Sequence, residues 1–420
     1  MANTETQSIL VVGGGMGGLT AAIEAAEAGY DTYIVEKNAY LGGRVAQLNK
    51  YFPKLCPPSC GLEINFRRIK ANPRIRFFTM AEVAQISGEE GNFDVTITLT
   101  PRYVNEKCTG CGKCAEACEM VIDNAFNFGM NKIKAAYLPH DMAFPMRYVL
   151  DPALVKSGEA QKVKDACPYD AIDLDMEEKT MDLKVGSIVW ATGWKPYDAN
   201  KLDTLGFGDY PDVITNVMME RLASWTGPTQ GKIVRPSDGE APKTVAFVQC
   251  AGSRDENHLP FCSGICCLAS MKQATYVREQ YPDAKIYMFY IDIRATDRLE
   301  GFYSKVKENE GIEFFKGKVA QVNQDESGKR LVLRVEDTTT EKLHEIPADL
   351  VVLATGMEPN TKETPLPVQV PYDDYGFMST AENKPGIYAA GCTRTPTFVT
   401  EVVQDGTAAA LKAIQSVVRR

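Results

Sequence analysis

The densest chemistry in the sequence is a run of cysteines in its second quarter. Cys108, Cys111 and Cys114 stand in C-x2-C-x2-C spacing, Cys118 follows, and Cys167 precedes a proline far downstream. Sites for [4Fe–4S] clusters use such a run with a remote Cys-Pro, and the fourth cysteine of the run serves a neighbouring cluster. The second triplet for that neighbour is missing. We therefore expect one [4Fe–4S] cluster on Cys108, Cys111, Cys114 and Cys167, with a zinc ion on the same thiolates as the alternative.

A second group of cysteines follows later, in C-x11-C-x3-C-C spacing. It comprises Cys250, Cys262, Cys266 and Cys267. Cys250 ends an apolar strand and the others surround the start of a helix, and ligand sites in parallel sheets form at strand carboxyl ends. We expect a second cluster here. Neighbouring helical residues point about 100° apart, so Cys266 and Cys267 share it only at a distorted first turn. Core packing and a redox dithiol are the alternatives.

Two further cysteines, Cys56 and Cys60, lie in the proline-rich loop YFPKLCPPSCG. Three interpretations stay open for them: they line a cofactor, they meet a metal cluster of a partner, or they pack an apolar loop. The chain has twelve cysteines in all. Because cytoplasmic thiols stay reduced, we interpret their spacing as metal or redox chemistry and not as a disulfide framework.

A glycine motif near the amino terminus predicts a dinucleotide site. Gly13, Gly15 and Gly18 form G-x-G-x-x-G between a strand and a helix, and Glu36 ends the next strand, followed by Lys37. The first glycine permits a tight turn, the second lets the backbone approach a pyrophosphate, and the third lets the helix pack on the strand. The helix amino terminus attracts the phosphates, and the Glu36 carboxylate can accept hydrogen bonds from ribose hydroxyls. A glycine turn without a ligand is the alternative.

Later segments favour FAD as the dinucleotide. A glycine-arginine step follows the acidic residue, and small residues recur directly after apolar strands. The residues involved are Gly43, Arg44, Thr192, Gly193, Gly391 and Cys392. This arrangement resembles the two-domain flavoproteins, in which the late glycine segment meets the flavin ring. Cys392 replaces the acidic residue usual in that family, so we expect ribityl contacts from backbone N–H groups. Ala-Thr-Gly follows an apolar strand twice, at 191–193 and 354–356, and plain strand-ending turns are the alternative for both segments.

The second strand–helix–strand unit begins with KTVAFVQ and carries no glycine fingerprint of its own. The chain reads Cys250-Ala251-Gly252-Ser253-Arg254 where a nicotinamide dinucleotide would need the glycine turn. We therefore expect no NAD(P)H site, and we expect electrons to enter through clusters. Neither a Ser–His–Asp set nor a paired-carboxylate pattern stands out, so we predict no catalytic residue beyond the cofactors.

These motifs fall on an α/β chain of two Rossmann-like lobes with an inserted module. Apolar strands and amphipathic helices alternate in both lobes, whereas the cysteine-rich insert shows no long periodic helix. We expect the FAD-binding domain in residues 1–102, 179–205 and 346–420, the inserted [4Fe–4S] module in 103–178, and the second lobe in 206–345.

Composition narrows the class of partner. Hydrophobic residues make up 44% of the chain and the net charge is −9, which opposes tracking along nucleic-acid phosphates. Apolar runs all fall well short of the about 20 residues that cross a bilayer. The start, MANTETQSIL, lacks the basic and apolar regions of a secretory signal. We expect a cytoplasmic protein that reaches a membrane only through partner subunits.

Four segments together resemble the A-type subunit of heterodisulfide reductase across nearly the whole chain. They are GGGMGGLTAAIEAAEAGYDTYIVEKNAYLGGRVAQL, CTGCGKCAEAC, VAFVQCAGSRDENHLPFCSGICC and GIYAAGC. The resemblance implies a fold of the FAD-dependent thioredoxin reductase type, an inserted ferredoxin-like module and an unusual cluster at the late cysteines. Because the chain starts at the FAD strand and stops after the closing helix, it is most similar to the short branch of that family, found in the quinone-interacting membrane-bound oxidoreductase (Qmo) complexes of sulfate reducers.

This branch implies a membrane-associated complex with quinone and haem sites on other subunits. The complex would pass electrons between menaquinol and adenylylsulfate (APS) reductase. Two other functions stay open: a flavin disulfide reductase that uses Cys262, Cys266 or Cys267, and a flavin-containing scaffold that only organises partners. Cofactor content separates the three, because only the relay needs both flavin and two clusters.

Overall fold

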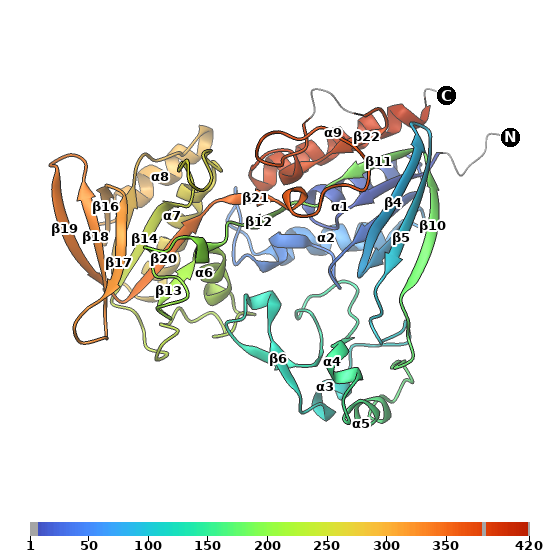
Figure 1. Cartoon of the computed structure of the whole chain (residues 1–420), viewed down its shortest axis with the longest axis horizontal. Coiled ribbons are helices and arrows are strands. Elements are labelled where there is room, and N and C mark those ends of the chain that lie inside the picture. Colours follow the sequence, from blue (N-terminus) through green and yellow to red (C-terminus); the bar gives the residue numbers. More distant parts are fainter. Residues whose placement is uncertain (1–6, 380–383, 419–420) are drawn as a thin grey trace. The chain divides into compact units, whose positions relative to one another are not determined.

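The computed structural model describes residues 7–379 and 384–418, which form two compact units (Figure 1). Unit 1 is drawn from Met1–Gln47, Lys54–Trp194 and Pro359–Arg420, and unit 2 from Leu48–Pro53 and Lys195–Glu358. The first six residues, on which the expectation about a secretory signal partly rests, lie outside the described part of the chain.

Unit 1 is built on a five-stranded parallel sheet in the order β22-β11-β1-β2-β3. Its inner strands read as continuous apolar runs because both faces of a parallel sheet are covered. The strands are β1 (Ile9–Val12), β2 (Thr32–Glu36), β3 (Ile75–Thr79), β11 (Ser187–Trp190) and β22 (Ile387–Ala389).

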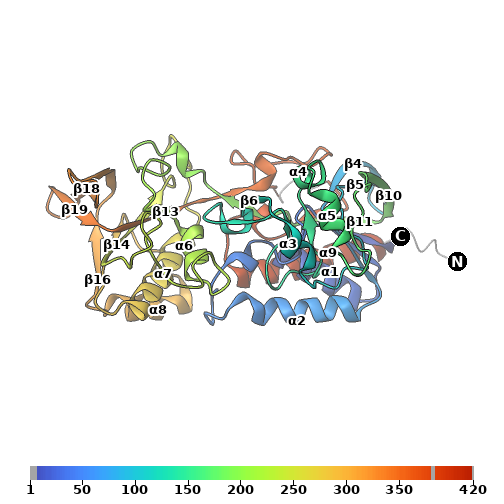
Figure 2. The ribbon, with the colours of Figure 1, turned by 90° about the horizontal axis from the view of Figure 1, so that it is seen from below.

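Different layers cover the two faces of this sheet. Helices α1 (Met16–Glu27) and α9 (Val399–Val418) lie side by side on one face, and α2 (Pro58–Ala71) runs beside α1 (Figures 1 and 2). On the other face, an antiparallel sheet shares a core with alternate residues of β1, among them Leu10 and Val12. Its strands are β4 (Ala81–Glu89), β5 (Asn92–Leu99) and β10 (Lys179–Val185).

The cysteine-rich insert folds inside unit 1 as short elements around a small core of its own. Its longest helix has six residues, in keeping with the missing helical periodicity. The elements are α3 (Lys113–Ala117), β6 (Val121–Asp123), β7 (Lys132–Lys134), β8 (Ala136–Tyr137), β9 (Val149–Leu150), α4 (Pro152–Val155) and α5 (Ala160–Asp165). We call residues 103–178 the inserted module.

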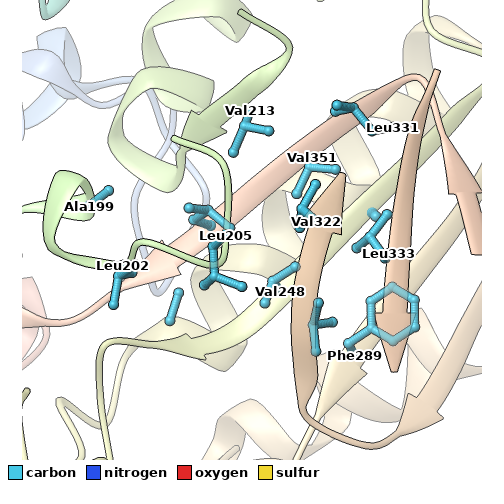
Figure 3. Packing of buried hydrophobic residues seen from close by; sticks show 14 of the residues in the cluster. Ala199, Leu202, Leu205, Val213, Val248, Phe289, Val322, Leu331, Leu333 and Val351 are labelled. Atoms are coloured by element: carbon cyan, nitrogen blue, oxygen red, sulfur yellow. The ribbon is translucent and has the colours of Figure 1, made fainter. Parts of the chain in front are cut away.

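Unit 2 repeats the layered plan of unit 1. A parallel sheet in the order β13-β20-β14-β15-β16 packs against an antiparallel sheet, β17-β18-β19, through a core that includes Val248, Phe289 and Leu333 (Figure 3). The strands are β13 (Val213–Thr215), β14 (Thr244–Ala251), β15 (Lys285–Tyr290), β16 (Ile312–Lys316), β17 (Val319–Gln324), β18 (Leu331–Asp337), β19 (Lys342–Ala348) and β20 (Leu350–Thr355). The helices are α6 (Asn216–Ala223), α7 (Cys266–Gln280) and α8 (Glu300–Lys307).

Short strands and turns of 3-10 helix complete the chain. The chain passes between the units along β12 (Trp194–Pro196) and β21 (Met357–Pro359), which pair with each other. The 3-10 turns are η2 (Gly43–Gln47), η3 (Ala125–Asn127), η4 (Ala199–Lys201), η5 (Asp297–Leu299), η6 (Asn360–Lys362) and η7 (Gly391–Thr393). Within the described ranges, the helices are all too short or too polar to cross a membrane.

The unit boundaries differ from the expected ones. The segment 346–420 was expected wholly in the first lobe, yet β20 lies in the middle of the second sheet and the chain returns to unit 1 only at Pro359. The earlier return, expected to end at residue 205, ends at Trp194. The physical reason is that a buried strand followed by Ala-Thr-Gly looks alike in both sheets. The stretch between β12 and β14 also holds β13 and α6 of unit 2.

A buried ion pair ties the short amino-terminal piece of unit 2 to its helices. The Lys272 Nζ lies 3.0 Å from the Glu220 Oε1, and the two side chains are 5% and 3% exposed. The same ammonium donates to the Lys50 carbonyl at 2.5 Å, and the Asn49 N–H donates to the Glu220 Oε2 at 2.9 Å. The pair therefore fixes the loop 48–53 on α6 and α7.

We expect Lys272→Met to lower the free energy of unfolding by about 3–5 kcal/mol, because it leaves the Glu220 carboxylate buried without a cation. Lys50→Met is the matched control, since its ion pair with Glu279 is 34% and 62% exposed and such surface pairs contribute about 1 kcal/mol or less. Urea denaturation followed by circular dichroism measures both. Equal losses in the two variants would contradict the assigned role of the buried pair.

Candidate functional site

A cavity of about 820 Å³ opens in unit 1 at the carboxyl ends of β1 and β2. Its size falls within the range of small-molecule and cofactor sites. The lining contains every predicted FAD-site residue except Gly18. These lining residues are Gly13, Gly15, Glu36, Lys37, Gly43, Arg44, Thr192, Gly193, Gly391 and Cys392. The structure thus brings together residues from four distant parts of the sequence.

Each glycine of the first motif has its own steric reason. Gly13 has φ +106°, and a Cβ there would lie 2.2 Å from the Ala191 carbonyl oxygen. A Cβ at Gly18 would lie 1.8 Å from the Gly13 oxygen, so Gly18 lets α1 pack on β1 and takes no part in the cavity wall. A Cβ at Gly15 would meet nothing closer than the Gly43 Cα at 3.9 Å. Gly15 alone therefore leaves open space on the cavity side, as close approach of a ligand requires.

The Glu36 carboxylate shapes the glycine loop as well as lining the cavity. Its Oε2 accepts a hydrogen bond from the Gly14 N–H at 2.5 Å, and its Oε1 accepts from the backbone and side chain of Asn38, both at 2.7 Å. Burial raises its pKa, against the opposing effect of these hydrogen bonds. The carboxylate therefore fixes the glycine loop through the Gly14 N–H. It also lines the cavity, where we expected it to accept hydrogen bonds from the ribose.

The Arg44 guanidinium forms one side of the cavity. It donates from Nε to the Trp194 carbonyl at 3.2 Å and from Nη1 to the Gln47 Oε1 at 3.1 Å. Its Cζ also lies 5.8 Å from the ring centroids of both Phe128 and Trp194. Burial lowers its pKa, although an arginine stays charged at neutral pH. A fixed positive charge beside the cavity suits an anionic ligand.

The turn after β11 is held by residues from the returning chain. Asn360 donates from Nδ2 to the Thr192 carbonyl at 2.6 Å, and the Gly193 N–H donates to the Thr393 Oγ1 at 3.0 Å. The sequence interpretation missed both Asn360 and Thr393. Their types are common in loops, and only the folded chain brings them to this turn.

Cys392 stands where two-domain flavoproteins have an acidic residue, and a carboxylate that the sequence interpretation missed, that of Asp405, lies beside it. The Gly391 N–H donates to the Asp405 Oδ2 on α9 at 2.7 Å, and Asp405 also pairs with Arg394 at 3.2 Å. Cys392 is buried beside them, and burial raises the pKa of its thiol to about 11. The acidic group therefore comes from the next helix. The only local signal was an Asp-Gly pair, Asp405-Gly406, inside an amphipathic helix.

The cavity fits FAD on features of its own. Gly15 provides a wall that a side chain would fill, and the amino terminus of α1 begins directly after it. The Arg44 guanidinium adds a positive charge at the cavity wall. These groups suit a ligand with a pyrophosphate.

Four of the module's five cysteines gather on one small cavity of about 20 Å³. Cys108, Cys111, Cys114 and Cys167 line it together with Tyr148. Burial, and then the neighbouring thiols, raise the pKa of Cys114 to about 12. Four free thiols from two distant segments match in kind the donor set of a [4Fe–4S] cluster.

Cys118 lies outside that cavity. Its side chain is 1% exposed, and its thiol faces the Met120 carbonyl at 3.5 Å and the Glu159 Oε2 at 3.9 Å. The Glu159 carboxylate also accepts from the Met120 N–H at 3.1 Å. Cys118 therefore packs the core of the inserted module, apart from the four-cysteine set.

The late cysteines meet at the carboxyl end of β14. Cys250 has φ +54° at a register shift between β14 and β20, and α7 begins at Cys266, so two cysteines fall in its first turn. The Cys262 thiol accepts from the Gly264 N–H at 3.3 Å. Burial and then the neighbouring thiolates of Cys267 and Cys250 raise the pKa of Cys266. The four sulfurs thus share one region of unit 2.

The loop after β14 is packed closed. Gly252 has φ +77°, and a Cβ there would come within 2.7 Å of the Tyr197 ring. The Tyr197 hydroxyl shares a hydrogen bond of 2.8 Å with the His258 Nδ1, and the Leu259 N–H donates to the Gly252 carbonyl. In this described part of the chain, no glycine turn leads directly from β14 into a helix, because α7 begins only at Cys266.

The remaining cysteines take no part in these groups. Cys56 is half-buried just before α2, Cys60 is exposed in the first turn of α2, and neither lines the large cavity. Across the described ranges, no three or more His, Cys, Asp or Glu side chains stand in an arrangement that could hold a metal ion. The cluster assignments therefore stay predictions.

Two family models match parts of the chain. Residues 8–52 match the family of FAD dependent oxidoreductases, and residues 289–410 match the pyridine nucleotide-disulphide oxidoreductases. The first match covers the glycine loop, Glu36 and Arg44. The second spans the end of unit 2 and the return to unit 1.

The chain is similar in fold to solved flavoenzymes. Thioredoxin reductase from T. acidophilum has a TM-score of 0.54 at 16% identity, covering 98% of this chain and 99% of that one. The bacillithiol disulfide reductase Bdr from Bacillus cereus has a TM-score of 0.52 at 13% identity, covering 99% of each chain. These likenesses show a fold of the thioredoxin reductase type, as expected.

Curated relatives match at higher identity. An A-type iron-sulfur subunit of the CoB–CoM heterodisulfide reductase of Methanopyrus kandleri is 38% identical over 97% of this chain and 64% of its own length. The A-type subunit of the ferredoxin/F420H2-dependent CoB–CoM heterodisulfide reductase of Methanosarcina acetivorans is 37% identical over 98% of this chain and 53% of its own. The chain thus spans about half to two thirds of these relatives. Over that span, it belongs to the family of heterodisulfide reductase A-type subunits.

Proposed function

We propose that the chain is an electron-transfer subunit that binds FAD and iron–sulfur clusters. One observation carries the proposal: within unit 1, the cavity that collects the predicted FAD residues and the cavity ringed by four cysteines belong to one compact body. Holding both carriers in one compact body keeps their separation fixed, which favours electron exchange between them. The names of the curated relatives, which are iron–sulfur or ferredoxin-linked reductase subunits, agree with it.

The chain's own residues would bind and orient FAD, which supplies one- and two-electron redox chemistry when it is bound. The backbone at Gly15 and the amino terminus of α1 would receive the pyrophosphate, since free N–H groups and the helix dipole favour anions. Glu36 would accept hydrogen bonds from the adenosine ribose. Arg44 would add positive charge beside the ligand.

Cys108, Cys111, Cys114 and Cys167 would hold a [4Fe–4S] cluster as thiolates. Metal binding releases the thiol protons, so the raised pKa of Cys114 describes the protein before it binds metal. Cys250, Cys262, Cys266 and Cys267 would hold a second cluster at the end of β14. Both sets consist of free thiols, and the proposed role of each is to pass single electrons.

The redox partners we propose are proteins. The closed loop at Gly252, packed on Tyr197, supports the absence of a nicotinamide site in unit 2. On the resemblance to the short Qmo branch, the chain would relay electrons between the menaquinone pool and APS reductase in sulfate respiration. Quinone and haem would belong to membrane subunits of the same complex, which would hold this chain at the cytoplasmic face of the membrane.

Replacing Gly15 by Leu should weaken FAD binding about tenfold to a hundredfold. The new side chain projects into the cavity wall, and such overpacking costs about 1–3 kcal/mol. The apoprotein should still fold, because Gly15 has an ordinary φ and no close neighbour. Gly158→Leu, at an exposed position with open space, is the control. Unchanged flavin content in a folded Gly15→Leu chain would defeat the assignment.

Replacing Cys167 by Ser should remove about four irons per chain, whereas Cys118→Ser should retain them. Of these two cysteines, only Cys167 lines the four-cysteine cavity. Iron analysis of the anaerobically purified variants, normalised to protein, gives the answer. Equal losses, or a loss confined to the Cys118 variant, would show that the ligand set is wrong.

NADH should not bleach the flavin of the isolated chain under anaerobic conditions. The native complex, given a menaquinol analogue and APS reductase, should turn over. Stopped-flow absorbance at the flavin band follows both reactions. Rapid, saturable bleaching of the flavin by NADH alone would contradict the proposed relay and would show that the chain is a pyridine nucleotide reductase. The disulfide reductase would instead be favoured if thiol titration finds a dithiol in the wild-type chain and Cys262→Ala loses that dithiol with its iron content unchanged.

A further inference from the structure

The inserted module supplies part of the wall of the large cavity. Ile122, Phe126, Tyr137 and Asp151 all line it, although they lie far along the chain from the glycine loop. A module present only to carry a cluster would not need to touch this cavity. Its residues instead continue the wall begun by the segment 37–47 after β2.

Direct contacts hold this wall against the flavin-side segment. The Gln47 Nε2 donates to the Phe126 carbonyl at 3.0 Å. The Phe126 ring stacks on His140, with centroids 4.6 Å apart, and meets Tyr40 edge-on at 5.6 Å. Phe126 is 9% exposed. Phe126 is therefore clamped from both sides of the junction between the module and the glycine-loop domain.

A second set of contacts fixes the base of the module. The buried Arg102 donates to the carbonyl oxygens of Arg147 and Ala39 and, at 3.0 Å, to the Thr79 Oγ1. The Leu41 N–H donates to the Phe144 carbonyl at 2.8 Å. The module thus has a defined seat on the domain that contains the cavity.

The module's core joins the cysteine cavity to this wall. Ala136 and Leu150 are fully buried in the core that contains Cys114, while their neighbours Tyr137 and Asp151 line the large cavity. Successive residues of a strand point to opposite sides. The short strand β8 therefore presents one side to the cysteines' core and the other to the cavity, and Asp151 lines the cavity directly after β9.

We propose that the inserted module is a retaining wall for FAD, and that loading of the four-cysteine site tightens it. This inference rests on the proposed function, since it takes FAD as the occupant of the cavity. The module has short elements and a small core, and such small folds usually depend on their metal. Iron bound at the cysteines stabilises β8 and β9, and those strands hold the wall. Flavin retention is thereby linked to cluster content.

The test measures the rate of FAD release from the holo chain after dilution, by the return of flavin fluorescence. Phe126→Ala should release FAD about tenfold faster, since an aromatic wall contact contributes about 1.4 kcal/mol. His140→Ala should also speed FAD release, because it removes the ring that stacks on Phe126 without changing a residue that lines the cavity. This variant provides the test if Phe126→Ala does not fold. Val121→Ala, at a 54% exposed position in the same module, is the control and should match wild type.

The link to iron needs a second comparison. Cys167→Ser, with its iron content measured, should speed release in the wild-type background and have a smaller effect in the Phe126→Ala background, because both changes act through one wall. If Phe126→Ala and His140→Ala both release FAD at the wild-type rate, the proposal that the inserted module retains FAD is wrong. If a Cys167→Ser chain that has lost its iron releases FAD at the wild-type rate, flavin retention is not linked to cluster content. A wild-type chain that holds no flavin overturns the proposed function itself, and this inference with it.

Discussion

The architecture of the large cavity depends on how closely the glycine loop approaches the strands around it. At Gly13 and Gly18 even a single methyl group would collide with backbone oxygens, at 2.2 Å and 1.8 Å. The Glu36 carboxylate then closes the loop by accepting the Gly14 N–H. Because the loop has no room to move back, the amino terminus of α1 and the open side of Gly15 face the cavity. The positions of Arg44 and of the turn after β11 follow from this close packing.

The same layered plan carries a different site in unit 2. There β14 has a left-handed Cys250 next to its last residue, together with a register shift against β20, and α7 begins only at Cys266. A glycine turn leading directly into a helix would expose N–H groups to a phosphate. The longer loop instead gathers thiols at the strand end and packs Gly252 against Tyr197. One arrangement of sheets and helices thus offers an anion site in one unit and a sulfur-rich site in the other.

Local sequence pattern was enough for the first βαβ unit and for the glycine loop and acidic strand end that line the cavity. Apolar runs, a glycine turn and an acidic strand end are short-range signals, and they correctly predicted β1, α1 and β2. Gly18 packs α1 on β1, the role that the motif gives to its third glycine, and it does not line the cavity. The strand β20 was placed in the wrong lobe, because its apolar pattern and its Ala-Thr-Gly ending also occur at β11.

What the sequence did not show depends on contacts between distant segments. Asp405 reaches Gly391 from a helix whose pattern predicts only amphipathic packing. Phe126 lies in the short 3-10 turn η3, and its place in the cavity wall follows from the contacts that hold the whole module, made by Arg102 and Gln47. No periodicity or spacing encodes such contacts. The four-cysteine set of the inserted module, in contrast, could be proposed from the sequence because such cluster sites combine a short C-x2-C-x2-C run with a remote Cys-Pro.

The proposed relay requires that a single chain hold flavin and clusters together. The most direct measurement is the cofactor content of the anaerobically purified wild-type chain, with flavin released by acid and quantified beside iron and sulfide. We predict one FAD and about eight irons per chain, with matching sulfide. A folded chain with flavin but no iron, or with neither cofactor, would contradict the relay.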